Sequence, residues 1–577
     1  MTEAPRPRYP ITYRTLPEAL LAAPPDQPFV TMWKSEDDVQ TVTFGEFVRL
    51  ALGQAAYLQQ RGLRQGDRVI LVMPQGIPLM TAFAGALCLG AIPAILAYPN
   101  FKVDPAKYRF GLAGVTGNLK ARLVVLDDEF PDELLEHVAL KDDAQVVHLK
   151  AQMPAPPAGF KPLDAAPDSV AFIQHSAGTT GLQKGVALSH AAVLLHLNHL
   201  SPALRLTSND CIYSWLPLYH DMGLIACFML PMVCHLPIVM QSPTDWVMQP
   251  GSMLEIITKY KCTLAWTPNF TLQFLARRVR PADRQDFDLS SLRMLINCSE
   301  PVRGSSMDEF RAAYAGCKLQ PHVLQASYAM AETVFAVTQS GIGADAGPKR
   351  IWVDADAVRK ERRAVQVADS TQGAMCFVSS GKCIPGCAVR AVSDSGKPLP
   401  EGGIGEILIR SDSLLTGYYN RPDLTEKALQ DGWYWSGDLG FALEGEVYVV
   451  GRKKDLIIVA GENIYPQDVE EIVSSHPAIH DGRVVAFGAY NPELGTEDIV
   501  VAAEVNREED LAEAARIERE LKTAITGELA VVARRIYLKP PKWVVKSTAG
   551  KPARSTTREK LIAEHPELQS NAAGPGL

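Results

Sequence analysis

The stretch from residue 69 to residue 101 contains no charged side chain, and it restricts the possible folds more than any other feature. A run of that length must leave water, either in a lipid bilayer or in the core of a folded domain. Prolines and glycines interrupt it at Pro74, Gly76, Pro78, Gly85, Gly90 and Pro93. These residues argue against a membrane-spanning helix, and the small ones suit close packing of a helix on a sheet. The stretch therefore predicts burial inside an α/β core.

Helical and extended segments alternate on both sides of this stretch. Thr43 and Glu46 fit a capping box, apolar positions recur as far as Leu58, and a strand is expected at 68–73 before a helix at about 77–89. Further strands and helices are expected near 92–97, 105–118, 121–127, 192–200, 211–217, 252–260, 262–266, 292–298 and 322–326. Such alternation predicts a parallel sheet covered by helices.

The pattern changes after about residue 376. Short β-rich pieces separated by Gly/Pro turns predict a distorted barrel or a small antiparallel sheet up to about residue 453. From Tyr465 onward, helix and strand alternate again in a compact unit that ends near residue 565. The chain is thus expected to be a multidomain α/β protein.

Composition limits the class of protein. With 577 residues, of which 47% are hydrophobic, the chain is expected to form two or more domains. The net charge of −8 argues against nucleic acid as the main partner. Residues 1–10 lack the apolar core of a secretory signal. A cytoplasmic enzyme without stable membrane insertion fits these features.

The ten cysteines lie mostly in apolar stretches, which predicts buried thiols in a reducing compartment. Only Cys383 and Cys387 lie close together in the sequence, and nothing near them completes a zinc site. The cysteines therefore predict no metal centre.

Residues 175–185 read HSAGTTGLQKG and lie between two apolar runs. Glycines let a backbone turn tightly and approach a ligand, while hydroxyls, exposed N–H groups and a lysine bind phosphate oxygens. The loop does not fit the Walker pattern, because Gln183 stands where the second glycine is needed, and it does not fit G-x-G-x-x-G. Its composition predicts a phosphate-binding loop of another kind.

Six further motifs follow this loop in order: PLYHDMGL (217–224), CSEPV (298–302), YAMAE (328–332), WYWSGDLG (433–440), GRKKDLIIVAGENIYPQDVE (451–470) and KSTAGK (546–551). Together they resemble the motifs of the adenylate-forming superfamily, which includes acyl-CoA synthetases, luciferases, peptide-synthetase adenylation domains and fatty acyl-AMP ligases. The resemblance covers about residues 10–565. It implies a large N-terminal domain (1–453, with the β-rich subdomain at about 376–453), a small mobile α+β C-terminal domain (454–565) and a flexible tail (566–577).

The resemblance also implies a reaction. A carboxylate is a poor electrophile, because attack on it must expel oxide, and joining it to AMP from ATP supplies a good leaving group. The enzyme must bring two anions together, which requires neutralisation of the phosphates and exclusion of water. The phosphate loop would act through Ser176, Gly178, Thr179, Thr180, Gly181 and Lys184. Ala177 and Gln183 depart from the serine and proline that are usual in the family.

Several residues of the later motifs match the family's nucleotide-binding positions. Glu332 matches the acidic ligand of Mg²⁺, and the Tyr328 ring would stack on adenine. Asp438 matches the aspartate that binds the ribose hydroxyls, with Arg452 assisting from the far side. The remaining nucleotide-binding positions are Ser299, Glu300, Pro301, Ala329, Met330 and Ala331.

Three residues match positions that act in catalysis or domain motion. Lys551 matches a catalytic lysine whose ammonium bridges the substrate carboxylate and the α-phosphate. Lys454 matches the hinge between the two domains. His220 would lie at the acyl entrance; the alternative interpretation is a hydrogen-bonded histidine at a helix start.

The motifs at 217–224 and 461–473 most resemble those of the fatty acyl-AMP ligases. The segment 353–378 resembles the insertion that distinguishes these ligases from acyl-CoA synthetases. It is expected to pack through Val353, Val358 and Val365 and to leave RKERR (359–363) in solvent.

The fatty acyl-AMP ligase branch passes its acyl-adenylate to the phosphopantetheine thiol of an acyl carrier protein. The stretch 534–560, with nine Lys or Arg against one acidic residue, is expected to help dock such an acidic carrier. The alternatives are an acyl-CoA or aryl-CoA synthetase and a non-catalytic protein that binds acyl-adenylate. The motifs do not specify the acyl chain, the carrier or the oligomeric state.

Overall fold

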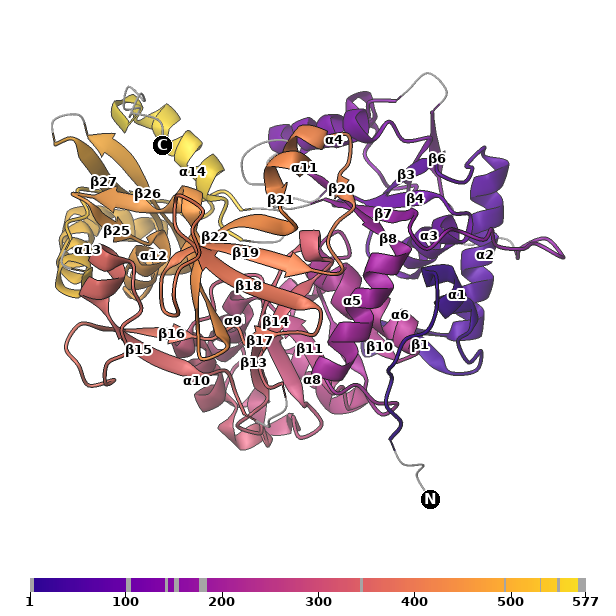
Figure 1. Cartoon of the computed structure of the whole chain (residues 1–577), viewed down its shortest axis with the longest axis horizontal. Coiled ribbons are helices and arrows are strands. Elements are labelled where there is room, and N and C mark those ends of the chain that lie inside the picture. Colours follow the sequence, from indigo (N-terminus) through magenta and orange to yellow (C-terminus); the bar gives the residue numbers. More distant parts are fainter. Residues whose placement is uncertain are drawn as a thin grey trace.

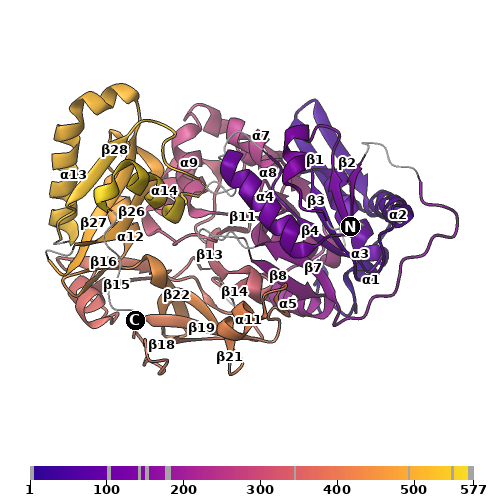
Figure 2. The ribbon, with the colours of Figure 1, turned by 90° about the horizontal axis from the view of Figure 1, so that it is seen from above.

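The computed structural model describes residues 5–99, 105–140, 144–149, 155–175, 184–342, 346–491, 494–529, 531–546 and 551–568. The N-terminal elements form one end of the molecule and the C-terminal elements form the other (Figures 1 and 2). No helix in these ranges has both the length and the apolar character needed to cross a membrane.

The uncharged stretch, described as far as residue 99, lies in a four-stranded parallel sheet with the order β4-β3-β5-β6. Its strands are β3 (Arg68–Val72), β4 (Ile92–Ile95), β5 (Leu123–Leu126) and β6 (Gln145–His148). The accompanying helices are α1 (Leu16–Leu21), α2 (Phe44–Gln60), α3 (Ile77–Cys88) and α4 (Pro105–Leu119). Helix α3 is buried along nearly its whole length, so the predicted burial in an α/β core is confirmed. The predicted capping box of Thr43 and Glu46 starts α2.

A nine-stranded sheet with the order β17-β14-β13-β12-β11-β9-β10-β1-β2 forms the centre of the molecule. Its strands are β1 (Pro28–Ser35), β2 (Asp38–Thr43), β9 (Ile212–Ser214), β10 (Ile238–Met240), β11 (Leu264–Thr267), β12 (Met294–Asn297), β13 (Leu324–Ala329), β14 (Ala336–Gln339) and β17 (Lys382–Cys383). The run from β1 to β13 is parallel, so the carboxyl ends of these strands meet at one edge. Ligands of open α/β sheets bind at that edge.

Helices connect the parallel strands, as the alternating pattern predicts. They are α5 (His190–Ala203), α6 (Leu230–Cys234), α7 (Pro243–Met248), α8 (Ser252–Tyr260), α9 (Asn269–Arg278), α10 (Gly304–Ala313) and the π-helix η2 (Met222–Met229). A smaller sheet has the order β20-β8-β7, where β20 is Gly417–Tyr418, and places β7 (Val170–His175) antiparallel to β8 (Gly185–Ser189). The predicted phosphate loop connects these two strands, and its residues 176–183 lie outside the described residues.

The β-rich region is a five-stranded antiparallel sheet. It contains β18 (Cys387–Val392), β19 (Gly405–Ser411), β21 (Leu429–Gln430), β22 (Trp433–Leu443) and β23 (Glu446–Arg452). Beside it lie the pair β15 (Arg350–Asp354) and β16 (Ala374–Val378), the short strand β20 (Gly417–Tyr418) and helix α11 (Pro422–Ala428). The second of the two predicted forms, a small antiparallel sheet, is thus the one that occurs.

The C-terminal residues build a separate α+β unit. It consists of β24 (Ile457–Val459), β25 (Glu462–Ile464), α12 (Pro466–Ser474), β26 (Ile479–Asn491), β27 (Thr496–Val505), α13 (Ala514–Leu529), β28 (Arg535–Lys539) and α14 (Arg554–Glu564). Apolar side chains of α12, β26, β27 and α13 form a core of their own. The multidomain α/β fold is confirmed, while the boundary at residues 453 and 454 stays a prediction.

The predicted flexible tail begins too early. Pro566–Leu568 form a 3-10 turn, and Leu568 is buried against Leu561 and Val544. Burial of a leucine side chain stabilises the folded state by about 2 kcal/mol relative to exposure, and this holds the turn in place. Residues 569–577 lie outside the described residues.

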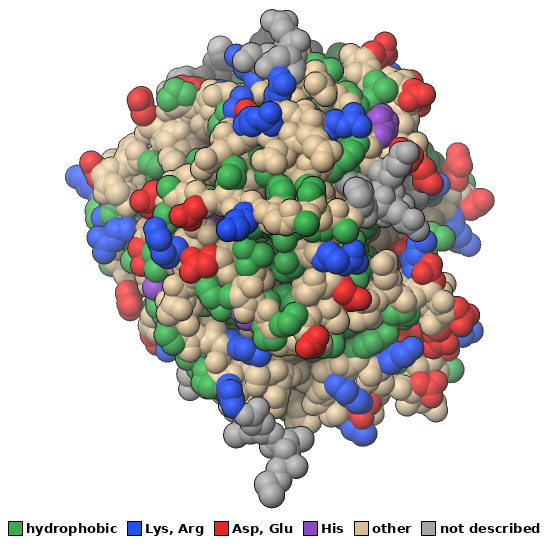
Figure 3. All heavy atoms as spheres, turned by 90° about the vertical axis from the view of Figure 1, so that its right-hand side faces the viewer, with side chains coloured by type: hydrophobic (Ala, Val, Ile, Leu, Met, Phe, Trp, Pro, Cys, Tyr) green, Lys and Arg blue, Asp and Glu red, His purple; other side chains and the backbone are tan. Residues whose placement is uncertain are grey.

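The N-terminal end of the molecule carries no large surface of one charge on the face that Figure 3 shows. Acidic and basic side chains are interspersed there with apolar ones (Figure 3).

We expect Gly85→Ala to destabilise the protein, because a Cβ at Gly85 would lie 2.5 Å from the Ala51 carbonyl oxygen of the neighbouring helix α2. Overpacking of this kind costs about 1–3 kcal/mol. The control is Gly111→Ala in α4, where a Cβ meets nothing within 4 Å and helix propensity improves. Thermal unfolding should show a lower Tm for Gly85→Ala alone; equal Tm values for both variants would contradict this packing.

Candidate active site

The predicted site residues gather where the nine-stranded sheet meets the β-rich sheet and the C-terminal unit. Ser299 follows the carboxyl end of β12, Tyr328 lies near the end of β13, and Glu332 lies in the turn after β13. Asp438 comes from β22 of the β-rich sheet. Lys551 reaches the same region from the C-terminal unit. The sheet edge thus brings together motifs that are far apart in the sequence.

Asp438 is the centre of a buried hydrogen-bonded group. The Tyr328 hydroxyl donates to Asp438 Oδ2 at 2.6 Å, and Arg452 Nε lies 3.1 Å from Oδ1. The pairing of β22 with β23 puts Asp438 directly opposite Arg452, which explains their spacing in the sequence. Burial raises the pKa of the Asp438 carboxyl, although Arg452 and the Tyr328 hydroxyl both oppose this rise. Asp438 is therefore held in one orientation before any ligand arrives.

Tyr328 differs from its predicted use as a stacking platform in one respect. Only 8% of the residue is exposed, and its hydroxyl orients Asp438. Sequence reasoning missed this second role, because nothing in the YAMAE motif indicates where the hydroxyl points. Stacking of adenine on the ring stays a prediction.

Glu332 lies in a second group around Tyr418. The Tyr418 hydroxyl donates to Glu332 Oε1 at 2.8 Å and lies 3.1 Å from the Tyr434 hydroxyl. Lys184 Nζ, from the described end of the phosphate loop, lies 4.8 Å from the centre of the Tyr418 ring. Burial and the Glu332 carboxylate raise the pKa of Tyr418. Tyr418 thus joins the loop lysine to the predicted acidic ligand, a connection that no motif revealed.

The turn that carries Glu332 is strained. Val334 is fully buried with φ 68° and ψ −55°, and β-branched residues avoid such positive φ values. Such strain persists only where surrounding contacts impose it, and it concentrates at functional sites. Here the Met330 N–H donates to the Phe335 carbonyl, and the Thr333 hydroxyl bonds to the Met330 and Phe335 carbonyls.

Lys551 extends from the C-terminal unit and donates a hydrogen bond to the carbonyl oxygen of Ser299. Ser299 has φ 69°, the left-handed region, in the turn after β12. The Asp221 carboxyl is close to Lys551: burial acts to raise its pKa, but His220, the Met222 N–H and Lys551 lower it below its usual range. The ammonium therefore lies beside a backbone carbonyl at the edge of the sheet, within electrostatic range of the Asp221 carboxylate.

His220 has the contacts of a hydrogen-bonded histidine at a helix start. Its Nδ1 lies 2.6 Å from Asp221 Oδ1, an ion pair when the ring is protonated, and the pair stands at the start of η2. The His220 carbonyl accepts the Leu224 N–H at 2.8 Å, as expected of a residue at a helix start. His220 is also near the Lys551 group through Asp221, so its place at the acyl entrance stays a prediction.

Lys454 contributes to the electrostatics of the site as well as to the predicted hinge. Partial burial and the nearby cations Arg452, Arg554 and Lys184 lower its pKa, while Asp455 opposes the shift. Four basic side chains thus act on one region near Glu332 and Asp438. Sequence reasoning assigned Lys454 only to the hinge and missed this concentration of positive charge.

Arg554 anchors the segment that carries Lys551. Its guanidinium contacts Asp455 Oδ2 at 2.7 Å, Glu470 Oε1 at 2.8 Å and the Ala486 carbonyl at 3.1 Å. At the base of the same loop, the Ala553 N–H donates to the Val545 carbonyl at 2.8 Å. The loop is therefore tied to Asp455, the neighbour of the predicted hinge.

The structure places the remaining residues of the nucleotide-binding prediction, and their roles stay predictions. Glu300 Oε2 accepts the Phe270 N–H at 3.0 Å, so this carboxylate caps the start of α9. Pro301 is exposed, and Ala329, Met330 and Ala331 form the end of β13 and the following turn. The other predicted residues of the phosphate loop, Ser176, Gly178, Thr179, Thr180 and Gly181, lie outside the described residues.

The expected packing of the segment 353–378 is partly wrong. Val353 and Val358 are buried as predicted, but Val365 is 39% exposed. Arg359 of the RKERR sequence is buried rather than in solvent, because its guanidinium donates to the Leu529 carbonyl at 2.7 Å and its own carbonyl accepts from Asn463. This segment therefore binds the C-terminal unit directly.

The large domain makes further contacts with the C-terminal unit through arginines. Arg303 donates to the Gln467 carbonyl at 2.7 Å and forms an ion pair with Glu471. Arg277 Nη1 lies 2.7 Å from Asp481 Oδ2. These contacts hold the unit in the orientation in which Lys551 meets Ser299.

The basic stretch 534–560 is less available for docking than predicted. Lys539 pairs with Glu564 at 2.6 Å, and Lys560 donates to the Trp543 carbonyl at 2.8 Å. Arg554 binds Asp455 and Glu470, as described above. Arg558 lies over the Phe487 ring at 5.6 Å. The excess positive charge of this stretch is therefore largely engaged in contacts within the C-terminal unit.

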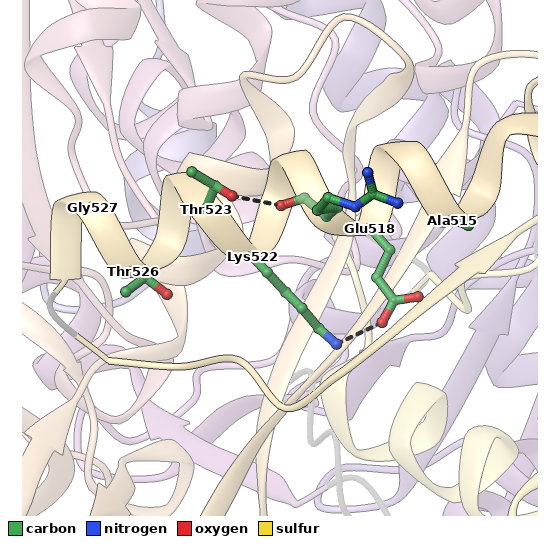
Figure 4. A pocket seen from close by; sticks show the side chains of 7 residues that line it. Ala515, Glu518, Lys522, Thr523, Thr526 and Gly527 are labelled. Carbon is green, nitrogen blue, oxygen red and sulfur yellow. Dashed lines mark hydrogen bonds and ion pairs between the residues drawn. The ribbon is translucent and has the colours of Figure 1, made fainter.

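A hollow on the outer face of α13 lies apart from this site. Its lining includes Glu518, which pairs with Lys522 at 2.7 Å, and Thr523, which donates to the Arg519 carbonyl at 2.9 Å (Figure 4). None of the described residues that the motifs single out lines it. The hollow is not a candidate for the active site.

Comparison with known proteins agrees with this geometry. Residues 18–419 match the family described as AMP-binding enzyme. The chain is 28% identical over 544 residues to a medium-chain-fatty-acid–[acyl-carrier-protein] ligase from Moorena producens, with 91% of each chain covered. It is 26% identical over 584 residues to a long-chain-fatty-acid–AMP ligase from Mycobacterium tuberculosis, with 95% of this chain and 98% of that protein covered.

Solved structures give the same result. A structure from a study of fatty acyl-adenylate ligases from E. coli and L. pneumophila has a TM-score of 0.87 at 26% identity, covering 97% of this chain and 100% of that one. The chain therefore belongs to the AMP-binding enzyme family. The predicted resemblance to the adenylate-forming superfamily, and within it to the fatty acyl-AMP ligases, is confirmed.

We expect Tyr328→Phe to weaken ATP binding by about tenfold, which corresponds to about 1.4 kcal/mol, because Asp438 loses a charge-assisted hydrogen bond that orients it. The control is Tyr314→Phe, which removes a buried hydroxyl bonded to the Leu275 carbonyl at 2.9 Å in another part of the large domain. Isothermal titration with a non-hydrolysable ATP analogue measures both. Unchanged affinity in Tyr328→Phe would separate Asp438 from nucleotide binding.

Proposed function

We propose that this protein activates a fatty acid with ATP to form acyl-AMP and pyrophosphate, and then transfers the acyl group to the phosphopantetheine thiol of an acyl carrier protein. The observation that carries the proposal is the contact of Lys551 with the Ser299 carbonyl at the sheet edge that also holds the Tyr328–Asp438–Arg452 group. Lysine from one domain and nucleotide-binding residues from the other meet at one place.

The first step follows from the charges at this place. A carboxylate oxygen of the acid attacks the α-phosphorus of ATP, a new P–O bond forms, and the bond to the pyrophosphate oxygen breaks. Lys551 lies where its ammonium can neutralise the carboxylate and the α-phosphate together, which is worth most in a site that excludes water. Lys184, Arg452 and Lys454 supply positive charge for the pyrophosphate that leaves.

Mg²⁺ fits the residues near the phosphate end. This ion binds through one or two carboxylates, substrate phosphates and water, so it does not need a cluster of protein ligands. Glu332 offers one carboxylate whose Oε1 already accepts the Tyr418 hydroxyl. The described residues contain no group of three His, Cys, Asp or Glu that could hold a metal alone. Bound Mg²⁺ would offset the charge of the phosphates, and Glu332 would hold it.

The choice of a carrier protein as acceptor rests on two features. A relative covering 91% of this chain is named as an acyl-carrier-protein ligase. In addition, Arg359 of the insertion-like segment binds the Leu529 carbonyl, and its own carbonyl accepts from Asn463 of β25. We infer that contacts of this kind hinder the C-terminal unit from adopting the orientation that productive transfer to coenzyme A needs.

Two alternatives make different predictions about products. An acyl-CoA or aryl-CoA synthetase would form the coenzyme A thioester, and a non-catalytic protein would bind acyl-adenylate without releasing pyrophosphate from ATP. Retention of Lys551, Glu332 and Asp438 in one site favours an enzyme over a binding protein.

We expect Lys551→Ala to reduce acyl-AMP formation by about 10²–10³-fold, the usual loss for one transition-state donor. The Tm of the variant should stay within a few degrees of the wild-type value, because the Lys551 side chain is not part of a hydrophobic core. Lys542→Ala, which removes an exposed lysine of the same segment, is the control and should keep full activity. Pyrophosphate release measures the rate; near-normal release by Lys551→Ala would refute the assigned role.

The acceptor is tested with the wild-type protein. We expect acyl-AMP to accumulate with ATP and fatty acid, to disappear when a holo acyl carrier protein is added, and to give little acyl-CoA with coenzyme A. Mass spectrometry of the products after each addition gives the answer. Acyl-CoA synthesis at a rate comparable to adenylation would contradict the carrier-protein acceptor and favour the synthetase alternative.

A further inference from the structure

Two cysteines face each other at the amino ends of two strands of the nine-stranded sheet, on the side opposite the active site. Cys211 comes directly before β9, and Cys262 comes just before β11, its parallel neighbour. Their Sγ atoms are 3.8 Å apart. Ser299 and Glu332 follow the carboxyl ends of β12 and β13, which run parallel to β9 and β11 in the same sheet, so the cysteine pair and the active site lie at opposite ends of the parallel strands.

The backbones on both sides of the pair are fixed. The Cys211 carbonyl accepts the Thr263 N–H at 2.8 Å, and the Cys211 N–H donates to the Thr263 hydroxyl at 3.1 Å. That hydroxyl in turn donates to Asp210 Oδ1 at 2.7 Å, and Arg293 Nε binds the same oxygen at 2.9 Å. A disulfide needs its sulfurs at about 2.0 Å, so the proposal requires rotation of the two side chains to close the present 3.8 Å separation.

The two thiols differ in access to solvent. Cys211 is partly exposed and Cys262 is buried. The hydrogen bond with Cys211 and then burial raise the pKa of the Cys262 thiol. An oxidant from solution therefore meets Cys211 first, with a second thiol directly behind it.

The other described cysteines are arranged differently. Cys383 and Cys387, which are closest in the sequence, do not pair through sulfur; Cys387 Sγ contacts the Ser411 hydroxyl at 3.4 Å instead. Cys376 is exposed, and the sulfurs of Cys234 and Cys298 contact serine hydroxyls. Among the described residues, Cys211 and Cys262 are the one pair with a sulfur–sulfur contact recorded within 4.0 Å.

We propose that Cys211 and Cys262 form an oxidation site at which a peroxide produces a disulfide between β9 and β11. The Cys211 thiolate attacks a peroxide oxygen, the O–O bond breaks, and protonation of the leaving oxygen gives water and a sulfenic acid on Cys211. The Cys262 sulfur then attacks the Cys211 sulfur, the S–O bond breaks, and the Cys262 proton leaves in a second water. Two thiols and one hydrogen peroxide thus give one disulfide and two waters.

The cross-link has a predictable effect on the fold and none on the chemistry. It closes the segment between Cys211 and Cys262, and such closure stabilises the native state by restricting the unfolded chain. The Tm of the oxidised protein should therefore rise. Adenylation should be unchanged, because the site residues lie at the other end of the strands.

The test treats the folded full-length protein with hydrogen peroxide, blocks the remaining thiols with an alkylating agent after denaturation, and maps tryptic peptides without reduction by mass spectrometry. The wild-type protein should yield the peptide of Cys211 joined to the peptide of Cys262, and dithiothreitol should separate them. Cys211→Ser and Cys262→Ser should each lose the joined peptide. Cys234→Ser, which removes a buried thiol from the same tryptic peptide as Cys211, should keep it.

Two results would overturn the proposal. One is oxidation of Cys211 to sulfinic acid with Cys262 still reduced, since the two sulfurs would then not meet. The other is complete alkylation of both thiols under conditions that already oxidise the exposed Cys376. Cys211→Ser is the primary variant, because its partly exposed position tolerates a hydroxyl better than the buried Cys262 position does.

Discussion

The contact between Lys551 and the Ser299 carbonyl is the interaction on which the rest of the site depends. A lysine ammonium can act on a substrate only if the C-terminal unit lies against the large domain in one particular orientation. Arg303, Arg277 and Arg359 each reach across to groups of that unit and favour this orientation. Within the unit, Arg554 ties the start of α14 to Asp455 and Glu470, so the lysine follows the position of the whole unit.

Electrostatics explains why the remaining side chains lie where they do. Carboxylate activation joins two anions. The described site has cations that can neutralise them and oriented hydrogen-bond acceptors that can bind the nucleotide. Lys184, Arg452, Lys454 and Arg554 act on one region, and partial burial together with the other three cations lowers the pKa of Lys454. Asp438 is held by the Tyr328 hydroxyl within the same region. Both groups are built before ligands bind, which reduces the reorganisation needed in the reaction.

Much of this arrangement could be predicted from the sequence, because the motifs are local and the periodicities are clear. The parallel core and the convergence of the 298–302, 328–332 and 433–440 motifs follow from the rule that ligands bind at the carboxyl edge. Tyr418 could not be predicted, since its contact with Glu332 depends on a short strand that crosses from the β-rich region. Burial of Arg359 was also missed, because a run of charges indicates solvent unless a partner carbonyl, here that of Leu529, is known.

The most direct test of the central claim is pyrophosphate–ATP exchange with the wild-type protein and a panel of fatty acids. The enzyme should incorporate labelled pyrophosphate into ATP only when a fatty acid is present, because the reverse of adenylation requires bound acyl-AMP. Acyl-AMP should be recovered from the same mixture by mass spectrometry. Exchange that is absent with every acid, while ATP still binds, would contradict the account and identify the protein as a nucleotide-binding protein without this activity.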